Sequence, residues 1–145
     1  MITVDDINES WGWCGLNAVA VLGENPFGNL LLLDDEGRCW RLRPQDLVCE
    51  PVASNHAELT ALAYNQAFLA TWYMPELVRL AEATLGPLVD DRKYCLKIPH
   101  SLGGEYQRDN FAMVPLPELI RFAGESAQQF DGYGGAQAEN YIPYA

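Results

Sequence analysis

The spacing of the apolar residues divides the chain into segments of different secondary structure. Val4, Ile7 and Trp11 are three and four positions apart, a spacing that predicts a short amphipathic helix over residues 4–11. Thr3 stands before the first of them as a candidate N-cap. We expect this helix to lie against a sheet, because strand-like segments follow it.

Short apolar runs bounded by turn residues predict the first strands. They cover residues 18–22, 29–33, 38–42 and 46–52. Asp35, Glu36 and Gly37 form a tight turn between the second and third strands, so an antiparallel meander is the simplest arrangement. Residues 30–33 are all leucine, which predicts a strand in the middle of the sheet that is covered on both faces.

The apolar period changes to that of helices after residue 53. Behind a possible cap at Ser54 or Asn55, apolar residues recur at helical spacing and indicate at least two helices. These residues are Leu59, Leu62, Ala63, Phe68, Leu69 and Trp72. Pro75 suits the first turn of a further helix, which Gly86 and Pro87 end.

Two strands and a final helix complete the pattern. Residues 95–98 and 111–115 read as short strands, joined through a glycine-centred connection at residues 103–104. Pro117 can open the last helix, in which Gly124 weakens the middle or marks an early end. The order of elements predicts an α+β fold, with a mainly antiparallel sheet of about five to six strands packed with several helices.

Length and composition indicate one domain. The chain has 145 residues, of which 49% are hydrophobic, enough for one packed core. We expect this domain to span residues 1–130 and a Gly/Tyr-rich tail to occupy residues 131–145. The tail is either flexible or held through Tyr133, Tyr141 and Tyr144 against the domain or a partner.

The charge balance argues against two classes of partner. The formal net charge is −11 at pH 7, so the surface repels nucleic-acid phosphates and anionic lipids and attracts basic protein surfaces. No apolar run is long enough to span a membrane, and the first residues lack the pattern of a signal peptide. We therefore expect a cytoplasmic protein that binds neither nucleic acid nor membrane.

The cysteines are scattered. Cys14, Cys39, Cys49 and Cys95 include no Cys-x-x-Cys pair, so the sequence indicates neither a zinc site nor a redox motif, and no cofactor is expected. The last three lie in strand-like apolar segments. We expect them to act as small buried hydrophobes in a reducing compartment.

Candidate catalytic residues are few. A surface or capping role outweighs a metal or general-base role for His56 and His100. Ser101 lies outside any Gly-x-Ser-x-Gly motif. A carboxylate pair could form between Glu105 and Asp109, but a solvated turn explains both without a substrate. The glycine pair lacks the Lys and Ser/Thr of a phosphate-binding loop.

Carboxylates gather in three short clusters. They are Asp5, Asp6 and Glu9; Asp34, Asp35 and Glu36; and Asp90 with Asp91. The simplest interpretation is that they are solvated turns and helix starts. The alternative is that some of them face a basic groove of a partner, where complementary potentials raise the association rate.

Two segments carry a resemblance to a known family. Residues 24–42 contain an Asn-x-Phe-Gly-Asn turn, an acidic hairpin turn and the strand with Trp40. Residues 102–106 read Leu-Gly-Gly-Glu-Tyr, and Asp109-Asn110 precedes the last strand. Over roughly residues 4–130 the chain resembles the bacterial domain family of type VI secretion immunity proteins, first recognised at the C-terminal end of proteins that neutralise DNase toxins.

The resemblance implies a non-enzymatic binder that holds a cognate effector toxin inactive in a one-to-one complex by covering its substrate cleft. The toxin would be a nuclease or a nucleotide-modifying enzyme, and its phosphate-holding lysines and arginines would suit an acidic inhibitor. The resemblance supplies no catalytic residue. The fold would depend on Phe27, Gly28, Trp40, Gly103 and Gly104. The residues that we expect to contact the toxin are Asp34, Asp35, Glu36, Asp90 and Asp91, with Trp13 and Tyr106 as aromatic anchors.

Two other functions stay open on the sequence. An enzyme acting on a small molecule would need a pocket assembled from distant residues such as His100, Glu105 and Asp109. A scaffold or regulatory module would bind an ordinary cellular protein instead of a toxin.

Overall fold

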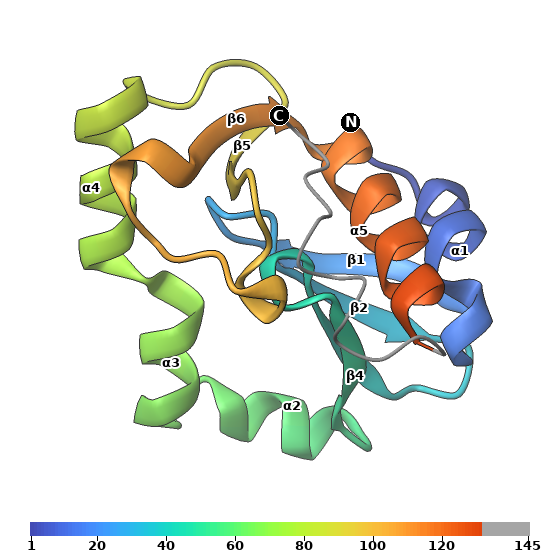
Figure 1. Ribbon diagram of the computed structural model, residues 1–145. Coiled ribbons are helices and arrows are strands. Elements are labelled where there is room, and N and C mark those ends of the chain that lie inside the picture. Colours follow the sequence, from blue (N-terminus) through green and yellow to red (C-terminus); the bar gives the residue numbers. More distant parts are fainter. Residues whose placement is uncertain (132–145) are drawn as a thin grey trace.

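Four strands form one antiparallel sheet in the computed structural model, which describes residues 1–131 (Figure 1). They are β1 (Ala18–Glu24), β2 (Leu30–Asp34), β3 (Cys39–Arg43) and β4 (Val48–Ala53). Each strand pairs with the next along the chain, so the predicted meander is confirmed. The predicted boundaries differ from the observed ones by at most two residues.

The two faces of the sheet are covered unequally. β2 lies inside the sheet, as predicted, between β1 and β3. Along it Leu30 and Leu32 are fully buried, whereas Leu31 and Leu33 are only half-buried. The prediction that this strand is covered on both faces therefore holds fully for the first face and only in part for the second, which α3 (Gln66–Tyr73) reaches through Arg41.

Helices α1 (Val4–Trp11) and α5 (Leu116–Phe130) cover the well-packed face and lie side by side (Figure 1). The predicted helix at the N-terminus is confirmed, with Thr3 as its N-cap in a capping box with Asp6. The two helices are tied by the indole N–H of Trp11, which donates to the carbonyl oxygen of Ile120 at 3.0 Å.

Gly124 occupies the closest approach of α1 and α5. A Cβ at this position would overlap the carbonyl oxygen of Ser10. The helix continues past Gly124 to Phe130, so of the two alternatives for Gly124 the early end is excluded. The glycine is explained by helix packing: without a side chain there, the two backbones can touch.

Helices α2 (His56–Leu62), α3 (Gln66–Tyr73) and α4 (Pro75–Leu85) follow β4 and form an arm along one side of the molecule (Figure 1). The cap of α2 is Asn55, whose side chain accepts from the backbone of Glu58, and Pro75 lies in the first turn of α4 as predicted. Every residue of α2 and α3 is exposed or half-buried.

The remaining strands, β5 (Arg92–Leu96) and β6 (Phe111–Pro115), form a separate antiparallel pair. The α+β class is confirmed, but the strands are divided between sheets of four and two instead of one sheet of five to six. The reason lies in the amides of β5. Those of Tyr94 and Leu96 donate to Pro26 (2.9 Å) and to the side chain of Gln45 (3.0 Å) instead of a neighbouring strand.

Phe27 and Gly28, in the turn between β1 and β2, join the two parts of the core. Phe27 is fully buried and packs against the rings of Tyr94 and Phe111 on the small sheet. A Cβ on Gly28 would lie 2.5 Å from Leu119 on α5. Both residues therefore act in packing, in keeping with the role that the family resemblance implied.

The glycine pair before β6 shapes a tight loop. Gly103 adopts a φ of +97° after a short 3-10 helix, and a Cβ on Gly104 would overlap the carbonyl oxygen of Ile98. The side chain of Asn110 bonds both the N–H (2.9 Å) and the carbonyl (3.1 Å) of Ile98. The predicted tail lies outside the described residues, except for Asp131.

Candidate functional site

Asp34, the first predicted contact residue, is buried, and its carboxylate accepts hydrogen bonds from its own hairpin. Its residue exposure is 2%, and its carboxylate accepts from the amides of Glu36 (2.9 Å) and Arg38 (2.8 Å). It also accepts from the Arg38 side chain and the Trp40 indole, both at 2.8 Å. Burial alone would raise the pKa of Asp34, but these hydrogen bonds outweigh it and hold the pKa at about 2. Asp34 therefore supports the turn and offers no free carboxylate to a partner.

The other two carboxylates of this turn face solvent. Asp35 is exposed, and Glu36 is exposed with its carboxylate 3.0 Å from Arg38. Such a surface ion pair is weak and easily exchanged for another partner. Asp35 and Glu36 thus remain the proposed contacts of the β2–β3 turn.

Asp90 and Asp91 lie in the connection between α4 and β5. Asp90 is exposed and has a left-handed φ of +50°. The backbone carbonyl of Asp91 accepts from the amide of Leu116 at 2.8 Å, and its carboxylate lies 2.9 Å from the amino group of Met1. Asp91 thus joins three parts of the chain, which leaves Asp90 as the freer carboxylate of the pair.

The two predicted aromatic anchors are half-buried. Trp13 stacks on Trp11 at 5.9 Å and donates through its indole N–H to Ser10 at 2.9 Å, so its ring supports the packing of α1. Tyr106 meets the ring of Phe27 edge-on at 5.7 Å. Burial, and the nearby Asp46 carboxylate after it, raise the pKa of Tyr106 to about 12.

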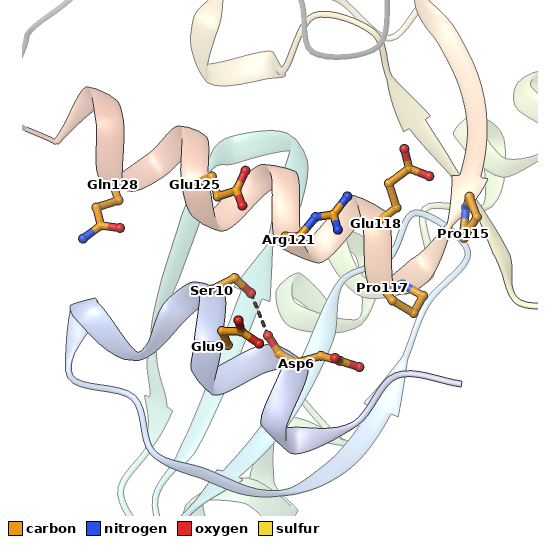
Figure 2. A pocket seen from close by; sticks show the side chains of 9 residues that line it. All are labelled: Asp6, Glu9, Ser10, Pro115, Pro117, Glu118, Arg121, Glu125 and Gln128. Carbon is orange, nitrogen blue, oxygen red and sulfur yellow. Dashed lines mark hydrogen bonds between the residues drawn. The ribbon is translucent and has the colours of Figure 1, made fainter.

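A groove of about 580 Å³ lies between α1 and α5 (Figure 2). Its lining residues are Asp6, Glu9, Ser10, Pro115, Pro117, Glu118, Arg121, Glu125 and Gln128. Four of them are carboxylates and one is an arginine, so the groove carries a formal charge of −3. We call it the acidic groove.

Two carboxylates of the acidic groove were singled out from the sequence and two were missed. Asp6 and Glu9 belong to the first acidic cluster, whereas Glu118 and Glu125 come from α5, more than a hundred positions away. Their spacing of seven residues, two turns of helix, puts them on one face of α5, and both line the groove. That spacing was the signal available in the sequence.

The groove carboxylates differ in how far the fold uses them. Asp6 accepts from the Thr3 amide at 3.1 Å and so belongs to the helix cap. Within residues 1–131, no ion pair engages Glu9, Glu118 or Glu125. These three side chains are therefore available to a cation supplied from outside the chain.

A second cavity, of about 370 Å³, is formed by β3, α3 and the loop that carries Tyr106. Its lining residues are Asn29, Arg41, Arg43, Gln45, Asp46, Ala70, Thr71, Met74, Leu77, His100 and Tyr106. We call it the arginine cavity. It contains His100 but neither Glu105 nor Asp109, so the three residues of the enzyme hypothesis do not line this cavity together.

The cysteines are reduced, and three of them pack as expected or nearly so. Cys39 and Cys95 are buried, and Cys49 is half-buried against the main core. For Cys14 no such expectation was made; a hydrogen bond from the Cys49 thiol lowers the pKa of Cys14 to about 6.

The described residues form neither a metal site nor a membrane-spanning helix. Residues 1–131 contain no group of three or more histidine, cysteine, aspartate or glutamate side chains placed to hold a metal ion. No helix in this range is both long and apolar enough to cross a membrane.

Fold and surface together define an α+β domain with a concave, carboxylate-lined face. Residues 53–125 match a family model described as "T6SS immunity protein Tdi1, C-terminal". This match covers half of the chain, which therefore belongs to that family of type VI secretion immunity proteins. A search of curated proteins found no match.

The matched range is shorter than the 4–130 that the sequence features suggested. It begins at the last residue of β4, includes α2 to α4 and the small sheet, and ends within α5. Glu118, Arg121 and Glu125 on the α5 side of the acidic groove lie inside the match, whereas Gln128, α1 and most of the large sheet lie outside it.

Proposed function

We propose that this protein binds a cognate type VI effector toxin and holds it inactive, protecting the cell that makes the toxin and its kin. The observation that carries the proposal is the family match over residues 53–125. On this proposal the protein is a cytoplasmic, non-catalytic binder that forms a one-to-one complex and requires no cofactor.

We further propose that inhibition works by occlusion of the toxin's active site. A nuclease or a nucleotide-modifying toxin holds phosphate groups with lysine and arginine side chains, and its cleft is therefore basic. A chain of net charge −11 has a favourable long-range field toward such a cleft. Charge complementarity of this kind mainly accelerates association and rejects wrong partners.

The acidic groove is the surface that best suits a basic partner. It is concave, its α5 carboxylates lie within the matched range, and Glu9, Glu118 and Glu125 have no ion pair within the described residues. The exposed carboxylates of Asp35, Glu36 and Asp90 are the remaining proposed contacts, at separate turns.

The proposed function can be tested by purification. The chain is co-expressed with the protein encoded by the neighbouring gene, and the complex is examined by size-exclusion chromatography with light scattering. We expect a stable one-to-one complex in which the effector's enzymatic activity is lost. Separate elution of the two proteins, with the effector fully active, would return the chain to the scaffold hypothesis.

A further inference from the structure

Arg41 on β3 is a buried cation whose acceptors are all neutral. It is only 7% exposed. Its guanidinium donates to Oδ1 of Asn29 from Nε (3.3 Å) and Nη2 (3.0 Å). It also donates to Oγ1 of Thr71 from Nη1 (2.8 Å) and to the Thr71 carbonyl from Nη2 (3.0 Å). Within residues 1–131, no carboxylate forms an ion pair with it.

The charge of Arg41 is thus compensated mainly by dipoles and rings, and the Asp46 carboxylate acts on it without forming an ion pair. The guanidinium lies 5.3 Å from the ring centre of Phe68 and 5.6 Å from that of Trp72. Burial lowers the pKa of Arg41 and the neighbouring Arg43 lowers it further, yet an arginine stays protonated in proteins. A buried charge without a counter-charge is costly, so an anion that reached this guanidinium would be bound favourably.

The arginine cavity gives an anion access to this charge. Arg41 and Arg43 contribute two positive charges to its lining and Asp46 one negative charge. Arg43 is already paired, with Asp46 at 3.6 Å and with Glu50 at 3.2 Å. Arg41 is therefore the cation of the cavity that has no carboxylate in an ion pair with it.

Hydrogen-bond donors for a ligand are also present. A guanidinium has five N–H groups, and the bonds to Asn29 and Thr71 use four of them. The Tyr106 hydroxyl, whose raised pKa keeps it protonated at neutral pH, has no hydrogen-bond partner within the described residues. Met74 and Leu77 add an apolar wall to the same cavity.

We propose that the arginine cavity binds an oxyanion, a carboxylate or phosphate group carried on a small, partly apolar body, with Arg41 as its counter-charge and Tyr106 as a hydrogen-bond donor. The cavity volume of about 370 Å³ is in the range of small-molecule sites. The group can come from a free metabolite or from an acidic side chain of the effector. The site does not depend on the proposed immunity function, because the chain alone contains it.

The test uses the isolated protein and NMR detection of the Arg41 Nε–H, which is buried and hydrogen-bonded. Sodium phosphate, sodium acetate and adenosine monophosphate are titrated separately at constant ionic strength, with chloride as the balancing anion. We expect a saturable shift of this resonance, with tighter binding of the monophosphate because it also meets the apolar wall. No saturable shift with any of the three probes would overturn the proposal.

Substitutions distinguish the binding of an anion from the structural role of Arg41, whose hydrogen bonds to Thr71 join β3 to α3. Y106F keeps the ring packing on Phe27 and is expected to weaken binding about fivefold through loss of the hydroxyl. R41Q is expected to weaken it about tenfold or more. R79Q, an exposed cation on α4, is the matched control. Equal weakening by R79Q and Y106F would overturn the site, and the Y106F result stands even if R41Q does not fold.

The effector then identifies the source of the anion. Release of bound monophosphate when the complex forms would show that an effector carboxylate takes the same cavity. Retention of the monophosphate in the complex would show that the ligand is a free small anion. Both outcomes support the oxyanion site, and neither depends on whether the effector is inhibited.

Discussion

At the scale of single residues, the least expected result concerns Asp34. The sequence shows three consecutive carboxylates in a turn, and nothing in that pattern tells which of them points inward. In the structure Asp34 accepts four hydrogen bonds, from two backbone amides and two side chains. Asp34 is the carboxylate that points inward because the buried indole N–H of Trp40, six positions away, needs an acceptor.

We predict that D34A lowers the free energy of unfolding by about 2–4 kcal/mol, because it strands the Trp40 indole N–H and two amides without an acceptor. D35A, at an exposed position of the same turn, should change it by less than about 0.5 kcal/mol. Chemical denaturation at neutral pH measures both. Equal losses in the two variants would refute the assignment of Asp34 as the supporting carboxylate.

The same residue predicts a pH dependence. The pKa of Asp34 is lower in the folded protein, about 2, than its ordinary 3.8, so the ionised form stabilises the fold. This contribution is complete above the ordinary pKa and is lost as the pH falls from about 4 toward 2. The stability difference between the unsubstituted protein and D34A should therefore shrink over that range, and a constant difference would contradict the pKa.

Gly124 is a residue whose role depends on a distant element. We predict that G124A destabilises the protein by about 1–3 kcal/mol, because the added Cβ would overlap the Ser10 carbonyl. This loss would come in spite of the better helix propensity of alanine. G12A is the control, since a Cβ there meets nothing within 4 Å. Thermal denaturation of both variants checks the prediction, and a stabilised G124A would show that α1 and α5 are not in close contact.

At the scale of elements, the sequence predicted those helices, caps and strands that depend on neighbouring residues. The helix at residues 4–11, its cap at Thr3 and the four-strand meander follow from spacing, capping and turn residues, and all were predicted. The separation of the small sheet was not predicted. It depends on hydrogen bonds that Pro26 and Gln45 accept from the amides of β5, far away in the sequence. The acidic groove was not predicted, for the same reason: the sequence showed the acidic cluster on α1, but the second wall of the groove comes from α5.

The acidic groove gives a prediction at this scale. The double variant E118Q/E125Q should slow association with the effector about tenfold at low salt and leave the fold intact, because both side chains are solvent-accessible and unpaired within the described residues. Stopped-flow kinetics at two ionic strengths measures this rate.

The control for the groove is E76Q/E82Q, which removes two exposed carboxylates from α4 and makes the same change in net charge. If this control slowed association as much as E118Q/E125Q, the effect would come from overall charge and the groove would not be the contact surface.

At the scale of the whole molecule, residues 1–130 are proposed to be one folding unit. The turn between β1 and β2 connects the two parts of the core, since Phe27 packs on the small sheet and Gly28 meets α5. We predict a single cooperative unfolding transition, in which hydrogen exchange of β2 and β6 reports the same free energy. Earlier opening of β6 would show that the small sheet unfolds separately.

The most direct test of the immunity function is growth of cells that produce the effector in the cytoplasm. The effector encoded beside this chain is induced with and without the chain present, and the E118Q/E125Q variant is tested in parallel. We predict that the chain restores growth fully and that the variant protects less when the effector is strongly induced. Continued death of cells that contain the folded, unsubstituted chain would contradict the proposal that it neutralises this effector.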